Sequence, residues 1–319
     1  MKTEDGWTIT FACPVVYHGD IPFLEVEASD KETVTLNGKV LIDHKEGLFH
    51  VPMDKVMKAA DNQLTVTGNP AAVTILLVPK SHFYLHENGE PSLDCMTRSL
   101  PDEGTILVSG SIKDPVEGDG LRYTLYAADG LVCDQVEVDA SNQDPVSLYT
   151  GKPVFWNGVR DSRMYYISAQ LIRRGRIQDE VGIPCGLRSF SLDVQGRFLL
   201  NGTEYPLRMA TVDERIGLES LKVMKEQGVT AIYHRAADSH PAFYTWCDYL
   251  GLIVLERIDP LSFHTSRVAN HPSICLWVAP SGTDGETMQS LRMKDLTRLT
   301  ISEDDIKNEN GDVKISMKF

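Results

Sequence analysis

The sequence has few of the features that mark a metal, redox or membrane protein. Its six cysteines are scattered, with no C-x-x-C pair and no histidines at the spacing of metal ligands. No apolar run approaches the ~20 residues that cross a membrane, and the polar first residues lack the hydrophobic segment of a secretory signal. We therefore expect a cytoplasmic protein with reduced structural thiols, no metal, no cofactor and no membrane partner.

Basic residues are also scarce. The chain has 31 Lys and Arg against 45 Asp and Glu, which gives a formal net charge of −14 at pH 7. Nucleic acids and anionic membranes select for basic surfaces, so we expect neither as a partner. The length of 319 residues and the hydrophobic share of 42% allow two or three domains, each with its own core.

The first 192 residues are rich in short strand patterns. Residues 7–11 and 24–28 alternate in polarity, and Asn37-Gly38 lies between two β-rich runs. This pair is a strong hairpin signal because both residues tolerate positive φ. A turn-rich stretch at residues 81–102 indicates a linker, and strand patterns return from residue 104. Short strands at this spacing predict β-sandwiches.

Strands and helices alternate after residue 198. Apolar residues at 218, 221 and 224 form a helical stripe that Gly228 ends, and residues 241–251 begin with Pro and end with Gly, as helices do. Unbroken apolar runs at 252–255 and 274–278 are typical of buried parallel strands. A further helix is expected from Met288 to Leu299. This alternation predicts a parallel sheet.

One motif is more specific than these patterns. Residues 270–277 read Asn-His-Pro-Ser-Ile-Cys-Leu-Trp and resemble the NHPSI-x-x-W segment of glycoside hydrolase family 2, the β-galactosidase and β-glucuronidase family. In that family the segment runs into the fourth barrel strand and ends in Asn-Glu, whose Glu is the general acid/base. Ser281 and Gly282 stand at these two positions here. Because glycine has no proton to donate, the resemblance implies the fold of a glycosidase without its chemistry.

Weaker likenesses to the same family occur in the same order along the chain. They are Val34–Lys39, Asn62–Val66, Gly186–Phe190 and Phe198–Gly202. The resemblance implies a multidomain β plus α/β protein: a jelly-roll sandwich at 1–100, an immunoglobulin-like sandwich at 101–192, and a partial TIM-type half-barrel of four β/α units at 193–287. A whole barrel needs roughly 250 residues, and only about 120 follow residue 198, so we expect the last four units to be missing.

Four parallel strands without their barrel partners would have bare edges, which invite pairing with another chain. Either residues 288–319 fold back as a covering segment, or two chains join as a homo-oligomer. The apolar positions of this segment, and the alternation of Val313–Met317, favour self-cover by a helix and a strand.

The resemblance also identifies candidate site residues. Retaining glycosidases need two carboxyl groups about 5–5.5 Å apart. The family's His-Glu after the first barrel strand is here Asp213-Glu214, and its Asp-Glu after the third is Glu256-Arg257. Glu214 and Glu256 could in principle form a new acid/base pair, although a solvated rim without function is the simpler interpretation.

Three residues are candidates for binding a sugar: His240, Asn270 and Trp277. The Trp277 ring would either stack on a sugar face or belong to the core. His271 is expected to be a packed, hydrogen-bonded turn histidine.

Three interpretations of function remain open. The first is an inactive relative of family 2 glycosidases that acts as a carbohydrate-binding or protein-interaction module. The second is an active β-glycosidase with relocated carboxylates, or with carboxylates supplied by a partner chain. The third is a decayed or fragmentary reading frame. The replaced acid/base favours the first or the third over the second.

Overall fold

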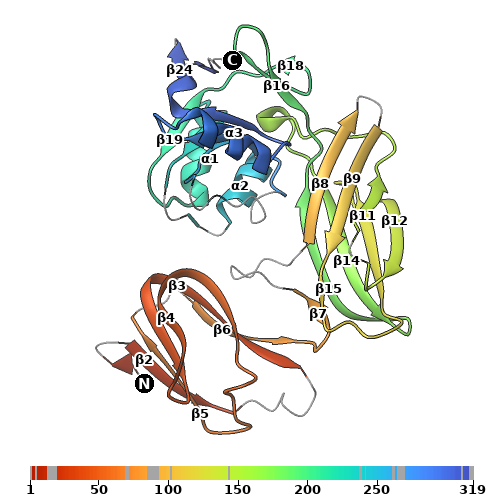
Figure 1. The fold of residues 1–319 in the computed structure, drawn as a ribbon, viewed down its shortest axis with the longest axis vertical. Coiled ribbons are helices and arrows are strands. Elements are labelled where there is room, and N and C mark those ends of the chain that lie inside the picture. Colours follow the sequence, from red (N-terminus) through yellow and green to blue (C-terminus); the bar gives the residue numbers. More distant parts are fainter. Residues whose placement is uncertain are drawn as a thin grey trace.

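The computed structural model describes residues 2–3, 6–12, 20–68, 72–84, 93–100, 103–142, 144–236, 239–240, 242–260, 263, 270–309 and 312–315. These residues form three units, shown in Figure 1 as N-terminal strands in red and orange, a sandwich in yellow and green, and an α/β unit in teal and blue. We call them the N-terminal unit, the middle sandwich and the α/β unit. No described helix is long and apolar enough to cross a membrane, and α3, with 10 residues, is the longest of those described.

The N-terminal unit is built on one six-stranded sheet. Its order is β1 (Lys2–Thr3), β2 (Gly6–Phe11), β5 (Asn62–Thr67), β3 (Ile21–Leu36) and β4 (Lys39–Pro52), with β6 (Ala72–Val78) also paired to β3. The predicted hairpin at Asn37-Gly38 is confirmed: Leu36 pairs with Lys39, and both turn residues have positive φ. Alternate residues of the long strands, such as Leu24, Val26 and Val34, are buried and form the core of this unit.

The middle sandwich packs two antiparallel sheets against each other. The first has the order β12 (Val132–Asp139), β11 (Gly120–Tyr126), β14 (Tyr165–Arg173) and β15 (Arg176–Cys185), and the second has β13 (Val146–Tyr149), β9 (Glu103–Gly110) and β8 (Leu93–Leu100). A short pair, β7 (His82–Phe83) with β10 (Ile112–Lys113), closes one end.

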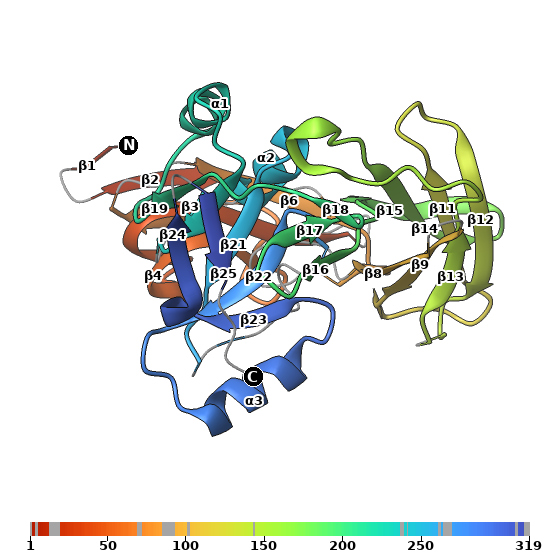
Figure 2. The ribbon, with the colours of Figure 1, turned by 90° about the horizontal axis from the view of Figure 1, so that it is seen from above.

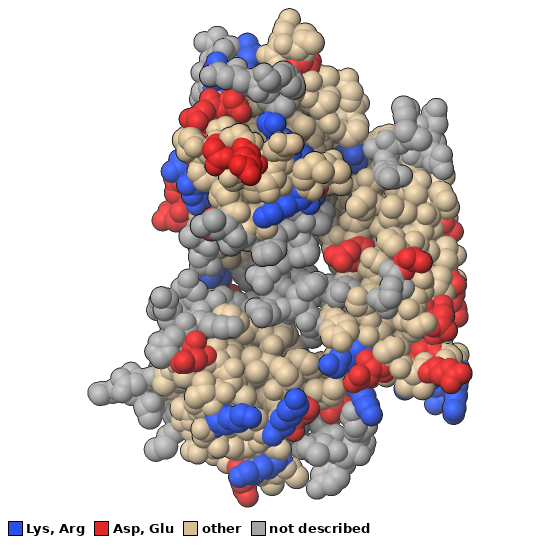
Figure 3. Space-filling model, in the orientation of Figure 1, with Lys and Arg blue, Asp and Glu red and all other residues tan. Residues whose placement is uncertain are grey.

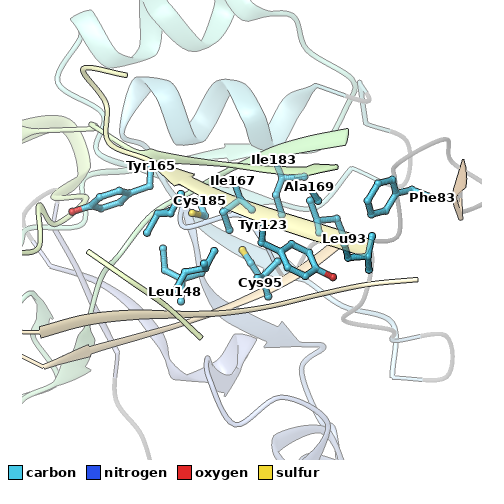
Figure 4. Close-up of a cluster of buried hydrophobic side chains, with 14 of the residues drawn as sticks. Phe83, Leu93, Cys95, Tyr123, Leu148, Tyr165, Ile167, Ala169, Ile183 and Cys185 are labelled. Atoms are coloured by element: carbon cyan, nitrogen blue, oxygen red, sulfur yellow. The ribbon is translucent and has the colours of Figure 1, made fainter. Parts of the chain in front are cut away.

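Side chains from both sheets fill the space between them. Figure 4 shows Ile167, Ile183 and Cys185 from one sheet meeting Leu148 and Cys95 from the other. A thiol hydrogen bond with Cys95, together with complete burial, raises the pKa of Cys185 well above its usual value. The five described cysteines are unpaired by disulfides, and Cys13 lies outside the described residues.

The α/β unit contains an open five-stranded parallel sheet. Its order is β19 (Met209–Val212), β20 (Ala231–His234), β21 (Ile253–Arg257), β22 (Ile274–Ala279) and β23 (Leu299–Ser302). The expected half-barrel of four strands is not what the structure shows, because Leu299–Ser302 adds a fifth strand beside β22. The helix expected from Met288 to Leu299 is shorter and earlier, since α3 runs from Gly285 to Lys294.

The two faces of this sheet have different covers. Helices α1 (Leu218–Glu226), α2 (Phe243–Leu250) and α3 share one core cluster with the sheet, through Leu221, Phe243 and Leu291. The other face packs on a small sheet of β16 (Phe190–Leu192), β17 (Phe198–Leu200) and β18 (Thr203–Glu204), and on the hairpin of β24 (Ile306–Glu309) and β25 (Asp312–Ile315). Figure 2 shows α3, β23 and the hairpin strands together at the C-terminal end of the unit.

The C-terminal hairpin is fixed in place by core contacts. Ile315 is 1% exposed in the cluster that also contains Phe198 and Leu255, and Ile306 packs against that cluster. The Ile315 amide donates a hydrogen bond to the Gly196 carbonyl at 3.1 Å. The β24–β25 hairpin therefore covers part of one face of the parallel sheet, while β19 and β23 form its two edges.

Candidate functional site

Parallel strands present their carboxyl ends at one edge of a sheet, where α/β proteins commonly place their sites. In register, Val212 at the end of β19 lies beside His234 of β20, His234 beside Glu256 of β21, and Glu256 beside Trp277 of β22. The strand order thus brings His234 and Glu256 together, and two polar networks occupy this edge.

The first network joins a hydroxyl, an imidazole and a carboxylate. His234 Nδ1 lies 2.8 Å from Glu256 Oε2, and the Ser239 hydroxyl lies 2.7 Å from His234 Nε2. The His234 side chain is 3% exposed and packs on the ring of Phe243, with ring centroids 4.4 Å apart. Because Glu256 is buried, its pKa is raised, although hydrogen bonds from His234 and Tyr244 oppose the shift.

The second network links the edge to the turn after β23. The Tyr233 hydroxyl donates to Glu303 Oε1 at 2.8 Å, in the one-turn helix η3 (Glu303–Asp305). Arg235 pairs with Asp213 at 2.9 Å and lies 3.7 Å from Glu303. Burial and the neighbouring Glu303 carboxylate raise the pKa of Tyr233 far above its usual range. These pairs bring β19, β20 and the residues after β23 together.

Gly282 lies in an open turn after β22. Its φ is +75°, and a side chain there would meet no atom within 4 Å. Its amide donates to Asp304 Oδ2 at 3.2 Å. The position that the resemblance to family 2 matches to an acid/base is therefore an exposed backbone turn without an acidic side chain. Among the described residues, no group of three His, Cys, Asp or Glu side chains is placed to hold a metal ion.

The structure separates the two candidate carboxylates by environment. Glu214 is exposed in the loop after β19, whereas Glu256 is bonded within the buried network. No hydrogen bond or ion pair joins the two among the residues that the structure describes. The two side chains thus lie in different surroundings, one largely buried and one in solvent.

Two of the three sugar-binding candidates have structural roles instead. Trp277 is 1% exposed, and its indole N–H donates to Asp295 Oδ2 at 2.8 Å, so its ring is not available to stack on a sugar. Asn270 accepts from the Cys95 amide at 2.8 Å and donates to the Leu93 carbonyl at 2.9 Å. Its amide thus pairs with strand β8 of the middle sandwich and is not directed to a ligand. A sugar-binding role for either residue stays a prediction.

The remaining candidate, His240, is partly buried beside α2. Its ring stacks on Trp246 with centroids 4.3 Å apart, and its Nδ1 accepts from the Ala242 amide at 3.1 Å. These contacts give it a role at the start of the helix. His271 is a bonded turn histidine, with Nδ1 2.6 Å from Asp248 Oδ2.

Sequence patterns did not single out Ser239, Asp248, Asp295 or Arg298. Asp248 also accepts from the Ser273 amide at 2.9 Å. Arg298 donates to the Ile274 carbonyl at 2.9 Å and pairs with Asp295 at 3.1 Å. Hydrogen bonds of this kind follow no local spacing, so no signal in one sequence could identify them.

Charge on the surface is mixed despite the net charge of −14. Figure 3 shows acidic and basic side chains of the described residues interspersed on one face of the molecule. Ion pairs contribute to this mixture, including Arg215 with Glu27 at 3.1 Å, which links the α/β unit to the N-terminal unit.

Two β units followed by a parallel α/β unit make this a multidomain β plus α/β protein. No family model matches the sequence. It is 28% identical to a β-glucuronidase of Bacteroides fragilis over 204 residues, which cover 47% of this chain and 29% of that protein. It is 24% identical to the β-galactosidase BoGH2A of Bacteroides ovatus over 163 residues, which cover 41% of this chain and 19% of that protein.

Solved structures share the fold over nearly the whole chain. An FMN-binding β-glucuronidase from Faecalibacterium prausnitzii superposes with a TM-score of 0.79 at 21% identity, covering 93% of this chain and 56% of that one. A glycosyl hydrolase family 2 member from Bacteroides cellulosilyticus gives 0.75 at 15% identity, covering 92% and 47%. The chain is thus similar in fold to glycoside hydrolase family 2 proteins, and it spans about half the length of these neighbours.

Proposed function

We propose that this chain binds carbohydrate without hydrolysing glycosidic bonds. The observation that carries the proposal is the turn at Gly282, which has no acid where the family's general acid/base would stand. A positioned general acid or base contributes roughly 10²–10⁴-fold to a rate. Names of the relatives, β-glucuronidase and β-galactosidase, support a carbohydrate as the ligand class.

The remaining carboxylates support the same conclusion. Glu256 is engaged by His234 and Tyr244, and Glu214 is exposed to solvent. The inner face of the sheet is packed with the side chains of the C-terminal hairpin, including Ile315. A substrate would thus meet a filled face and an edge whose largely buried carboxylate, Glu256, is already hydrogen-bonded.

Nitrophenyl β-D-galactoside and β-D-glucuronide test the absence of hydrolysis. We expect no release of nitrophenol above the rate in buffer. Glu256→Gln and Glu214→Gln are the decisive variants, since turnover that either substitution abolishes would show that a relocated carboxylate performs catalysis and would refute the proposal. Turnover that survives both substitutions and copurifies with the chain would refute the proposal as well, and would place catalysis on other residues.

The hydrogen-bonded row Ser239–His234–Glu256 favours a second candidate function, ester hydrolysis. A base beside a hydroxyl, oriented by a carboxylate, is the arrangement that activates a serine nucleophile. His234 Nε2 would take the Ser239 proton as Oγ attacks the ester carbonyl carbon, and would then protonate the departing alkoxide. Water would then attack the carbonyl carbon of the acyl group on Ser239. His234 Nε2 would take the proton of that water and return it to Ser239 Oγ as the acid departs.

Nitrophenyl acetate tests this second candidate. Hydrolysis that Ser239→Ala and His234→Ala both abolish would support it, and the control Ser162→Ala should leave it intact. Equal hydrolysis by all variants would exclude Ser239 as a nucleophile.

A further inference from the structure

A groove of about 770 Å³ lies between the middle sandwich and the α/β unit, away from the edge of the parallel sheet. One wall is the outer face of the sheet β11–β14–β15. The other is the last turn of α2, which carries Tyr249, and residues 161–164 connect the two walls. Three tyrosines, at positions 126, 166 and 249, line this groove.

A flat row of rings crosses the first wall. Tyr126 of β11 pairs with Tyr166 of β14, and Tyr166 pairs with Pro184 of β15. Their neighbours Leu125, Ile167 and Ile183 point into the core of the sandwich. Because successive side chains of a strand point to opposite faces, the row lies on the outer face of the sheet.

The ring of Tyr166 is held close against this sheet by the absence of a side chain at position 182. A Cβ on Gly182 would overlap the hydroxyl and ring carbons of Tyr166. The ring therefore lies across the backbone of β15, while Tyr166 remains 46% exposed. An exposed ring that lies on a sheet offers a platform for a flat apolar surface.

The opposite wall is fixed by contacts between units. The Ser162 hydroxyl donates to the Tyr249 carbonyl at 2.7 Å, and the Trp156 indole donates to the Asp248 carbonyl at 2.9 Å. Tyr249 itself is 58% exposed. Its position does not depend on a ligand, because two unit-spanning hydrogen bonds anchor the turn that carries it.

Charged side chains surround the rings. Asp161 and Arg163 pair at 2.9 Å through Oδ1 and Nε, and Glu180 accepts from the Ser168 hydroxyl at 2.7 Å. Asp161 and Arg163 neutralise each other, so the groove has a net negative charge that comes from Glu180. Burial, and next the Glu180 carboxylate, raise the pKa of Tyr166. A ligand with its own carboxylate would be repelled there.

We propose that this groove binds a neutral pyranoside, with Tyr166 and Tyr249 as the platforms for the sugar. The carbohydrate class rests on the proposed function. The C–H groups on one face of a pyranose carry partial positive charge and suit the negative face of an aromatic ring. Ligand sites combine such apolar surface with a few polar groups, and Arg163, Glu180 and Ser162 can bond the sugar hydroxyls. Net negative charge favours a galactoside over a glucuronide.

Saturation-transfer NMR on the full chain tests the proposal with methyl β-D-galactopyranoside and methyl β-D-glucuronide as probes. We expect transfer to the galactoside and weaker transfer to the glucuronide. Tyr166→Ala and Tyr249→Ala should each weaken galactoside binding by about tenfold, as the loss of an aromatic contact typically does. Tyr149→Ala is the matched control, because Tyr149 is a 49% exposed tyrosine on β13 outside the groove. It should bind as the unaltered chain does.

Gly182→Ala provides a second variant that retains every tyrosine. Its methyl group displaces the Tyr166 ring, so binding should fall while the unfolding temperature changes little. Unchanged binding in the Tyr166, Tyr249 and Gly182 variants would overturn the groove assignment and leave the proposed function standing. If neither probe receives saturation transfer from the unaltered chain, that result would instead contradict the proposed function. Tighter binding of the glucuronide would overturn the choice of a neutral sugar.

Discussion

The buried end of strand β22 and the exposed turn after it differ in what their residues do. Trp277 on the strand bonds to Asp295, which also pairs with Arg298, and both charged side chains are at most 6% exposed. Five residues further on, Gly282 has open space around it and no side-chain function. The motif that resembles family 2 thus lies on a buried strand, and the residue that we propose has lost the acid/base role lies in the exposed turn after it. Similarity of a motif can reflect the needs of folding alone.

The largest expected effect is the loss of the buried network. Asp295→Ala removes the carboxylate that pairs with Arg298 and that accepts from the Trp277 N–H. Removal of one partner of a buried ion pair costs about 3–5 kcal/mol. We expect urea denaturation to show that the free energy of unfolding falls by this amount. Asp284→Ala is the control. It removes the N-cap side chain of α3, which accepts from the Thr287 amide, and should lower the free energy of unfolding by about 1 kcal/mol. Equal losses in the two variants would contradict the special role of the buried network.

An intermediate effect is expected at Asn270, where the motif holds another unit in place. Asn270→Ala leaves the Cys95 amide and the Leu93 carbonyl of β8 unbonded, at a cost of about 1–3 kcal/mol. Hydrogen exchange at the Cys95 amide should accelerate. Asn142→Ala removes only bonds within its own turn, to Asp144, and should leave β8 protected. Unchanged exchange at Cys95 in the Asn270 variant would return that residue to the candidates for ligand binding.

The smallest expected effect concerns the pH dependence of stability at the strand edge. Burial raises the pKa of Glu256 above its ordinary 4.5. The folded state therefore holds this proton more tightly than the unfolded state, and the stabilisation is complete below the unfolded pKa. It is lost as pH rises through the folded pKa. Glu256→Gln removes the titration, so the variant should gain stability relative to the unaltered chain over that window. Parallel curves of unfolding free energy against pH would refute this account of Glu256.

Local patterns predicted local structure well in this chain. The Asn37-Gly38 hairpin formed as expected, and the helix expected at 241–251 appears as α2 at Phe243–Leu250. Strand β23 was missed because its four residues, Leu-Thr-Ile-Ser, followed a stretch with helical spacing. The fifth strand exists because it pairs with β22, which is tertiary information.

The candidate site was less predictable because its geometry depends on distant partners. Asn270 bonds to a backbone amide 175 residues away, so its role could not be inferred from the motif around it. Trp277 had two interpretations that only burial could separate. The tyrosines at 126, 166 and 249 come from two units and show no shared spacing. Only the glycine at position 282, which we propose stands in place of an acid/base, was visible in the sequence itself.

The central claim is that this fold retains its packing and a sugar-binding capacity without glycosidase chemistry. One NMR sample of the 319-residue chain with methyl β-D-galactopyranoside tests both parts directly. We predict saturation transfer to the galactoside and no anomeric signals of free galactose after a day. Free galactose that appears with the unaltered chain but not with Glu256→Gln would contradict the account.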